Sequence, residues 1–405
     1  MKTLLIILDG LGDRPIKELN GKTPLEAAEK PNLNKLAEKG ICGMMNSVDF
    51  GVRPGSDTSH LSIFGYDPAI YYTGRGPIEA AGAGIELKPG DVALRANLGT
   101  VDEKLTILDR RAGRIDSVKP FEEDLNNIKL AGVQVIFRAG VEHRGAVVLR
   151  GRNLSSSVSD PDPHEVGLKV KKIIPLEKTK AAENTAKLLE EYCSKAHLML
   201  KNHTVNKERQ NKGLLPANYL LVRGAGIVPN IPSFKERYGL NAACIAGGGL
   251  YKGIGRLLSM SILTVEGATG GANTNLTAKF NAVKKALEQC DFVFLHIKGT
   301  DSLSEDGDFI GKKHFIERVD SATPIISSLN DLLIVVTGDH STPSYLKQHS
   351  ADPVPILFCG GGVRTDDVQE FGERACAKGG LGRIKGSQLM PEIINLLGKS
   401  KLYGA

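Results

Sequence analysis

The sequence predicts an α/β protein built on a mostly parallel sheet with helices on both faces. Two observations support this: short, continuous apolar runs, and segments of helical periodicity between them. Continuous apolar runs are typical of strands buried on both faces. The strand-like runs are Leu4–Leu8, Ala242–Ile245, Phe292–Ile297, Leu332–Val336 and Val354–Phe358, and the helix-like segments include Leu276–Leu287 and Phe309–Leu329. Because these runs lie toward the two ends of the chain, one sheet is expected to draw on both.

The middle of the chain, from about Asp91 to Tyr238, has a different pattern. It contains shorter strand-like runs at Val133–Phe137 and Ala146–Leu149, polar turns, and a long helical stretch at Thr179–Leu200. A chain of 405 residues is long enough for two domains. We therefore expect a core domain of residues 1–90 and 239–405, interrupted by an α+β cap of residues 91–238, with hinge strands near residues 88–92 and 238–242.

The composition is that of a water-soluble globular protein, with 41% hydrophobic and 24% charged residues. No run approaches the length needed to span a bilayer, so no membrane association is expected. The first apolar run is stopped by Asp9 and lacks a small-residue cleavage site. It is interpreted as a first strand rather than a signal peptide, and a cytoplasmic location is expected.

Several other functions have little support in the sequence. The net charge is +6, Trp is absent, and no Lys/Arg block is interleaved with aromatic residues, which argues against nucleic-acid binding. The 6 cysteines show no CxxC spacing and are expected to be reduced thiols. The Gly-rich segments GAGIELKPG, IAGGGLYKG and FCGGGV lack nucleotide-loop spacing and are interpreted as tight turns.

Acidic residues follow three of the apolar runs. Asp9 ends the first run, Asp301 follows Phe292–Ile297, and Asp339 with His340 follows Leu332–Val336. Ligands bind outside the carboxyl ends of parallel strands. A single Asp at such a place is more often a helix cap. Several converging carboxylates and imidazoles, however, need a divalent cation to neutralise them, and His349 could complete such a site.

A second motif, RPGSDTSH, spans Arg53–His60 and precedes a helix-like segment. Gly55 permits a turn, and Ser56 is predicted to begin a helix, where free backbone N–H groups favour an anion. Ser56 is either a helix cap or a nucleophile on this motif alone. A serine hydroxyl needs a base or a metal ion to activate it, so proximity to the acidic residues would favour the nucleophile.

The combined motifs resemble a known family from the first residues to the C-terminal region. The matching segments are ILDGLGDRP, RPGSDTSHL, YYTGRGPIEAAGAG, VSDPDPHEVG, LVRGAG, LYKGIGRLLSM, HIKGTD, TGDHSTP and HSADPVP. Together they resemble the archaeal-type cofactor-independent phosphoglycerate mutases of the alkaline phosphatase superfamily. The resemblance implies an alkaline-phosphatase-like core that interconverts 3-phosphoglycerate and 2-phosphoglycerate, in glycolysis and gluconeogenesis. It implies a phosphoserine intermediate at Ser56 and no 2,3-bisphosphoglycerate cofactor.

The resemblance also implies two divalent metal ions. Asp9, Ser56, Asp339 and His340 match the ligands of one site, and Asp301 and His349 match ligands of the other. One position departs from the family, because Glu305 stands where related enzymes usually carry a metal-binding histidine. Glutamate would favour Mn²⁺ or Mg²⁺ over Zn²⁺. Mn²⁺ is therefore the expected metal, with Mg²⁺, Zn²⁺ and Co²⁺ as alternatives. Alternatively, Glu305 points away, and Asp306 or water completes the shell.

A mutase must hold glycerate while it reorients, which requires cationic donors and a closing cap. The candidate substrate-binding residues are Arg223, Lys252, Asp160, His164, His143 and Arg144. Lys252 resembles the family's substrate-phosphate lysine, and it and His164 are the candidate catalytic residues beside Ser56. For each lone Arg or Lys the alternative is a solvated surface charge, and for His164 it is a turn-stabilising role.

Three other functions remain open at this point. A metal-dependent phosphomonoesterase would let water attack the phosphoserine. A paralogous phosphotransferase would act on another small hydroxylated acid. A metal-binding protein with a decayed site is suggested by Glu305 alone. Whether the chain forms a homo-oligomer is also left open.

Overall fold

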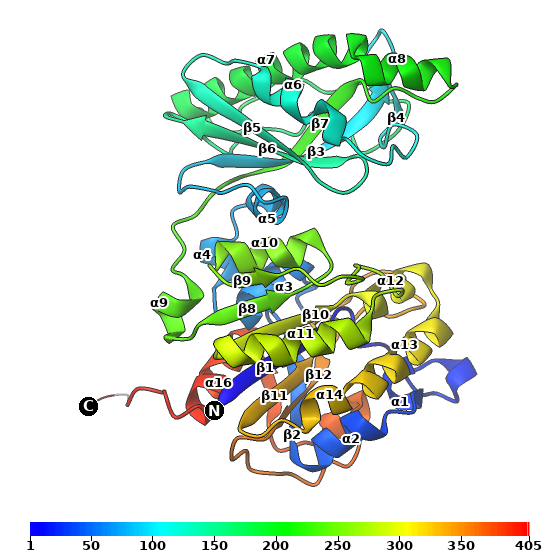
Figure 1. The fold of residues 1–405 in the computed structure, drawn as a ribbon, viewed down its shortest axis with the longest axis vertical. Coiled ribbons are helices and arrows are strands. Elements are labelled where there is room, and N and C mark those ends of the chain that lie inside the picture. Colours follow the sequence, from blue (N-terminus) through cyan, green and yellow to red (C-terminus); the bar gives the residue numbers. More distant parts are fainter. Residues whose placement is uncertain (403, 405) are drawn as a thin grey trace. The chain divides into compact units, whose positions relative to one another are not determined.

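A computed structural model describes residues 1–402 and 404 of the chain (Figure 1). It contains two compact units. The first unit comprises Met1–Tyr71 and the chain from Ile231 onward, and the second comprises Tyr72–Asn230. The first unit is therefore built from both ends of the sequence, as its apolar runs predict.

The first unit is organised around an 8-stranded sheet with strand order β13-β2-β12-β11-β1-β10-β8-β9. The strands are β1 (Lys2–Leu8), β2 (Gly40–Asn46), β8 (Ala242–Ile245), β9 (Ser261–Leu263), β10 (Phe292–Ile297), β11 (Leu332–Thr337), β12 (Val354–Cys359) and β13 (Gly382–Lys385). β1 pairs in parallel with both β10 and β11, whereas β12 runs antiparallel to β11 and β2. The sheet is thus mostly parallel, which confirms the predicted fold class.

Helices cover both faces of this sheet. They are α1 (Pro24–Ala27), α2 (Pro31–Glu38), α3 (Ser56–Ile63), α4 (Pro68–Tyr71), α9 (Phe234–Tyr238), α10 (Gly249–Leu257), α11 (Leu276–Gln289), α12 (Gly299–Asp306), α13 (Phe309–Ala322), α14 (Pro324–Ser327), α15 (Glu373–Cys376) and α16 (Leu389–Leu396). α11 and α13 bury Phe280 and Phe315 in one core with Val293 and Leu295 of β10. Side chains alternate across a strand. Phe294 of β10 therefore faces the other side, where it packs on Phe64.

The strand directions bring several loops to one edge of the sheet. β1, β10 and β11 are parallel, so their carboxyl ends lie at the same edge. β12 runs the opposite way, which places its beginning, not its end, at that edge. The segments that follow β1 and β10 and the connection from β11 to β12 therefore meet at this edge, and they carry Asp9, Asp301, Asp339 and His349.

The second unit is an antiparallel sheet with helices. Its elements are α5 (Arg75–Gly82), β3 (Val92–Val101), β4 (Ile107–Asp109), α6 (Glu122–Asn127), β5 (Val133–Ala139), β6 (Arg144–Gly151), α7 (Lys180–Asn202), α8 (Thr204–Asn211) and β7 (Tyr219–Ile227). β3 pairs with β6, β7 and, at its end, β4, while β5 pairs with β6. This is the α+β organisation predicted for the middle of the chain.

Each face of the second sheet has its own core. On one face α7 buries Leu189 and Tyr192 against β3 and β7 residues such as Leu98 and Leu220. On the other face α5 packs on β3, β6 and β7. By packing, residues 72–90 therefore go with the second unit. In contrast, α9 goes with the first, because Phe234 stacks near Phe292 of β10. The sequence indicated that residues 72–90 belong to the core domain and that α9 belongs to the cap. The structure groups each of these segments with the other unit.

The strand predictions agree with the structure to within two residues, whereas one helix prediction needs correction. The stretch Phe309–Leu329 is two helices, α13 and α14, rather than one. Pro324 starts α14 because it has no N–H to continue the hydrogen-bond ladder of α13. In residues 1–402 and 404, no helix is both long and apolar enough to cross a bilayer.

Candidate active site

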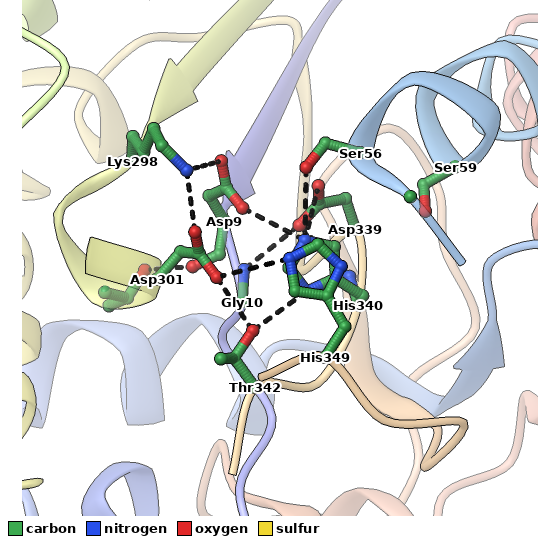
Figure 2. Close-up of polar contacts among 12 residues, drawn as sticks. Asp9, Gly10, Ser56, Ser59, Lys298, Asp301, Asp339, His340, Thr342 and His349 are labelled. Atoms are coloured by element: carbon green, nitrogen blue, oxygen red, sulfur yellow. Dashed lines mark hydrogen bonds and ion pairs between the residues drawn. The ribbon is translucent and has the colours of Figure 1, made fainter. Parts of the chain in front are cut away.

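Two overlapping groups of metal-ligating side chains lie at the convergent edge (Figure 2). Asp9, Asp339 and His340 form the first group, and Asp301, His340 and His349 form the second. In each group the ligating atoms all lie within 4.8 Å of one another. His340 belongs to both groups. Together the two groups contain five of the predicted metal ligands, Asp9, Asp301, Asp339, His340 and His349.

The first group is held by the backbone. The N–H groups of Gly10 and His340 each donate to Asp339 Oδ1 at 3.0 Å. Gly10 has a φ of +61°, and a Cβ there would lie 2.7 Å from both Asp301 Oδ1 and Thr342 Oγ1. Only glycine fits this position without strain, which explains the residue after Asp9.

The second group contains a histidine oriented by the chain around it. His349 Nδ1 lies 2.9 Å from the carbonyl oxygen of Pro54. A carbonyl can only accept, so Nδ1 carries the proton and Nε2 presents its lone pair. That Nε2 lies 3.9 Å from Asp301 Oδ1. His349 is therefore in the tautomer that a metal ligand requires.

Thr342 fixes the orientation of the shared histidine. Its hydroxyl donates to Asp301 Oδ1 at 2.8 Å and lies 3.0 Å from His340 Nδ1. Because that hydroxyl hydrogen is used on Asp301, the threonine oxygen accepts from His340 Nδ1–H. His340 Nε2 consequently points at Asp9 Oδ1 and Asp339 Oδ2, each at 3.3 Å. Sequence reasoning missed Thr342, although it stands inside the TGDHSTP motif.

The charges of these groups are strongly coupled. Burial raises the pKa of Asp339 to about 8, and the charge of Asp9 adds to the shift. Burial would lower the pKa of His340, but Asp339 and Asp9 raise it to about 9. Burial opposes the ionisation of Asp9 as well, yet Lys298 and hydrogen bonds from His296 and His340 hold its pKa well below the ordinary value.

These features fit a divalent cation. Asp9 Oδ1 and Asp339 Oδ2 are buried and share His340 Nε2 at 3.3 Å, but neither has a well-formed hydrogen bond of its own among the described residues. Unpaired buried carboxylate oxygens are costly unless a cation compensates them. The oxygen and imidazole donors suit Mn²⁺, Mg²⁺, Zn²⁺ or Co²⁺.

Ser56 lies beside the first group. It is the first residue of α3, after Gly55, as the motif predicts. Gly55 has an ordinary φ of −85°, so the turn itself does not require glycine. A Cβ there would lie 2.5 Å from Asp57 Oδ1. The Ser56 hydroxyl lies 3.3 Å from His340 Nε2, so serine and the shared histidine face each other (Figure 2).

Three buried aromatic side chains behind the site were missed by sequence reasoning. The Tyr251 hydroxyl donates to Asp9 Oδ2, and His296 Nε2 lies 3.3 Å from the same oxygen. His60 donates from Nδ1 to the Ser56 carbonyl oxygen at 2.6 Å. Burial lowers the pKa of His60 to about 4 and that of His296 to about 3, so both are neutral near pH 7. Both histidines stand in motifs already singled out, which is the signal that could have identified them.

Lys298 supplies the positive charge nearest to the carboxylates. It follows β10, and its ammonium donates to Asp301 Oδ2 at 2.6 Å and to Asp9 Oδ2 at 3.4 Å. Sequence reasoning did not select it, although it is the lysine of HIKGTD.

Two predicted site residues of the first unit lie apart from the two groups. Glu305 is exposed near the end of α12 and belongs to neither group. Although the residue as a whole is exposed, its carboxyl is partly desolvated, and this desolvation together with the charge of Asp301 raises the pKa of Glu305. Lys252 is half-buried on α10, and its charge acts on Cys244 and Lys279. Direct roles for Glu305 and Lys252 stay predictions.

Three predicted residues of the second unit, His164, Arg223 and Asp160, lie close to one another. His164 Nδ1 lies 3.1 Å from Arg223 Nη1 and 3.2 Å from Arg110 Nη2. Arginine nitrogens are donors, so His164 Nδ1 accepts and its proton is on Nε2. Asp162, which sequence reasoning missed, is buried and pairs with Arg110 at 2.6 Å. Asp160 accepts from the Gly224 N–H at 2.9 Å, beside Arg223.

The second unit also gathers arginines around the half-buried side chain of Arg95. Burial lowers the pKa of Arg95 to about 10, Glu79 opposes the shift, and nearby arginine charges add to it. The nearby arginines are Arg75, Arg144 and Arg223. His143 is buried, and its pKa is lowered to about 4 by burial and by Arg144. Arg95 was missed, although an arginine inside the apolar run VALRANLG is unusual.

Comparison with known proteins identifies the family. A family model described as 2,3-bisphosphoglycerate-independent phosphoglycerate mutase matches residues 37–206. An Archaeoglobus fulgidus protein named 2,3-bisphosphoglycerate-independent phosphoglycerate mutase 1 is 51% identical over 412 residues, covering 100% of each chain. The solved structure of a cofactor-independent phosphoglycerate mutase from Thermoplasma acidophilum is 41% identical, with a TM-score of 0.76, and covers 98% of this chain and 100% of that one.

A second solved structure, of a Pyrococcus horikoshii protein, is 40% identical with a TM-score of 0.85 and covers 100% of this chain and 99% of that one. The resemblance seen in the motifs is therefore confirmed over the whole length. The chain belongs to the family of 2,3-bisphosphoglycerate-independent phosphoglycerate mutases.

Proposed function

We propose that the protein interconverts 3-phosphoglycerate and 2-phosphoglycerate, with Ser56 carrying the phosphoryl group between the two half-reactions. The observation that supports this most directly is the Ser56 hydroxyl, which begins α3 and lies 3.3 Å from His340 Nε2 at the edge of the acidic groups. The names of the full-length relatives agree with this activity.

Each half-reaction exchanges one phosphate ester for another. In the first, the bond between phosphorus and the glycerate 3-oxygen breaks as a bond to Ser56 Oγ forms, and the serine proton ends on the glycerate hydroxyl. In the second, the 2-hydroxyl attacks phosphoserine and its proton returns to Ser56. No external phosphate donor is needed, because the phosphoryl group stays in the site between the steps.

Two divalent ions, Mn²⁺ first among them, are proposed to complete the site. Asp9, Ser56, Asp339 and His340 would hold one, and Asp301 and His349 the other. A bound ion supplies Lewis acidity that polarises the phosphoryl group and lowers the pKa of the serine hydroxyl. Thr342 and the Pro54 carbonyl accept hydrogen bonds from Nδ1–H of His340 and His349, respectively. Both imidazoles would therefore bind an ion through Nε2.

The second unit is proposed to act as the cap that binds glycerate. Its arginines Arg144 and Arg223 and the partly desolvated Arg95 would pair with carboxylate or phosphate oxygens. His164, held in one tautomer by two arginines, would act on a glycerate hydroxyl through Nε2. Asp160 and His143 would border the same site, and Lys252 would contact phosphate from the first unit.

The decisive experiment compares Ser56→Ala with Ser59→Ala. Ser59 lies on the same helix and bonds Ser47 Oγ at 3.1 Å instead of facing His340. Conversion of 3-phosphoglycerate is assayed after chelation and after readdition of single metals. We expect Ser56→Ala to lose more than about 1000-fold in kcat, as for removal of a covalent nucleophile, and Ser59→Ala to remain active.

Full activity of Ser56→Ala would exclude the covalent route. Release of inorganic phosphate without 2-phosphoglycerate would indicate a phosphomonoesterase instead. No reaction with either phosphoglycerate, in a protein that binds Mn²⁺, would point to another small hydroxylated acid as substrate.

A further inference from the structure

The Lys298 ammonium lies between the two donor groups. Lys298 Nζ lies 2.6 Å from Asp301 Oδ2 and 3.4 Å from Asp9 Oδ2. Asp9 belongs to the first group and Asp301 to the second. Figure 2 shows the amine between these two carboxylates, on the side away from His349.

The Lys298 ammonium pairs with one oxygen of Asp301, and the other oxygen of the same carboxylate faces the rest of the second group. Asp301 Oδ2 accepts the ammonium, whereas Asp301 Oδ1 accepts the hydroxyl of Thr342 and lies 3.9 Å from His349 Nε2. An ion bound through Oδ1 would therefore lie a few ångströms from a positive charge on the same carboxylate. Like charges at such a distance repel strongly where little water screens them, and the Asp301 side chain is only 1% exposed.

The Lys298 side chain has access to solvent. It is 27% exposed, whereas the side chains of Asp9 and Asp301 are 0% and 1% exposed. A lysine stem is flexible, and its ammonium is readily hydrated once it reaches water. Burial would lower the pKa of Lys298, but Asp9 and Asp301 raise it well above its ordinary value, so the ammonium stays charged.

We propose that Lys298 is an internal cation that competes with a divalent ion for Asp301 and so sets the affinity of the second donor group. With the ion bound, the ammonium withdraws toward solvent. With the ion removed, the ammonium bridges Asp9 and Asp301 and keeps these buried carboxylates from destabilising the edge of the sheet. This inference rests on the proposed metal site but not on the identity of the substrate.

The test uses Lys298→Met, which removes the charge and keeps the length of the stem. Lys298→Arg retains a cation. The matched control is Lys313→Met, because Lys313 pairs with Glu317 at 2.7 Å, is 23% exposed, and has no ion pair with either donor group among the described residues. Mn²⁺ binding to the chelator-stripped full chain is measured by titration, and thermal midpoints are measured with chelator and with saturating Mn²⁺.

We expect Lys298→Met to bind Mn²⁺ at least about tenfold more tightly than the native chain, since a neighbouring positive charge has been removed. Lys298→Arg should bind no more tightly than the native chain. With chelator, the thermal midpoint of Lys298→Met should fall below that of the native chain, and saturating Mn²⁺ should remove the difference. Lys313→Met should leave the Mn²⁺ affinity unchanged.

Unchanged or weaker Mn²⁺ binding by Lys298→Met would overturn the proposal, because the ammonium would then not compete. Tighter binding by Lys298→Arg would overturn it as well, which keeps the test decisive if the methionine variant fails to fold. Failure of the proposed function gives a different pattern: the affinities shift as expected, but no phosphoglycerate is converted.

Discussion

The two donor groups at the edge of the sheet differ in how firmly they are held. In the first, the side chains of Asp9, Asp339 and His340 are 0% exposed, and two backbone N–H groups fix one oxygen of Asp339. In the second, His349 is 21% exposed, Lys298 contacts the carboxylate of Asp301, and Glu305 lies in solvent. The first group is thus fixed by burial and by the backbone, whereas the second includes more exposed side chains, on which we propose that its affinity for an ion depends.

Replacing the histidines His340 and His349 tests most directly whether the two groups differ in this way. His340→Ala removes a donor shared by both groups, so Mn²⁺ binding and kcat should fall by more than about 100-fold, beyond the effect of outer-shell contacts. His349→Ala should cost less, and added Mn²⁺ should restore part of the activity. Metal content and kcat measured side by side check this. Equal losses in the two variants would show that the groups do not differ as described.

The pH dependence of metal binding tests the protonation of the first group. The pKa of His340 is raised to about 9, above its ordinary value of 6.5. An ion must displace that proton, so Mn²⁺ affinity should rise with pH between about 6.5 and 9, by at most about tenfold per unit for one proton.

The same raised pKa of His340 makes the metal-free protein, measured in chelator, less stable as the pH rises. The stabilisation from charged His340 is fully present below pH 6.5 and is lost as the pH rises through about 9. For Mn²⁺ binding, titration calorimetry in buffers with different ionisation enthalpies counts the protons that the protein releases when the ion binds. A flat Mn²⁺ affinity across this range would mean that His340 is already neutral.

Thr342 connects the two groups, so its substitution tests whether they are coupled. Thr342→Val removes the hydroxyl that donates to Asp301 and accepts from His340. We expect Mn²⁺ affinity to fall by about 10- to 100-fold, the usual cost of an outer-shell partner. Thr342→Ser, which keeps the hydroxyl, is the control and should stay near the native value. A similar loss in both variants would assign the effect to disturbed packing around residue 342 rather than to the hydrogen bonds, because Thr342→Ser keeps the hydroxyl.

The smallest effect is expected at Glu305. Because its side chain is exposed and outside both groups, Glu305→Gln should change activity by no more than a few-fold. Glu305→His should remain active and shift the metal preference toward Zn²⁺, since imidazole is a softer ligand than carboxylate. Relative activity with Mn²⁺, Mg²⁺ and Zn²⁺ measures this. An unchanged preference in Glu305→His would show that this position does not reach the ion.

The sequence predicts much of this arrangement because its signals are local. The five strand-like runs each became a strand, and Ser56 begins a helix as RPGSDTSH predicts. The sequence identifies Asp9, Asp301 and Asp339 as candidate metal ligands because each follows a parallel strand, and parallel strands end at one edge of the sheet. The catalytic and ligand roles given to these residues stay predictions.

The rest of the site depends on contacts between distant segments, which no local pattern encodes. Tyr251 and Asp9 are 242 positions apart in the chain, and the bond between them depends on how α10 packs on α3 and β8. Lys298 and Thr342 reach Asp301 through rotamers that follow from packing. The division between the units was also hidden, because residues 72–90 contain α5, whose apolar face is covered only when β3, β6 and β7 have assembled.

The strand order of the first unit has a consequence for the synthesis of the chain. β1 lies between β10 and β11, so its backbone has no neighbouring strand until the ribosome has passed residue 297, and its second neighbour is complete only at residue 337. The strands of the second unit, β3 to β7, all fall within residues 92–227 and can pair much earlier. An unpaired apolar strand is a template for aggregation. Residues 2–8 therefore need shielding during most of translation, while the middle of the chain is already able to fold.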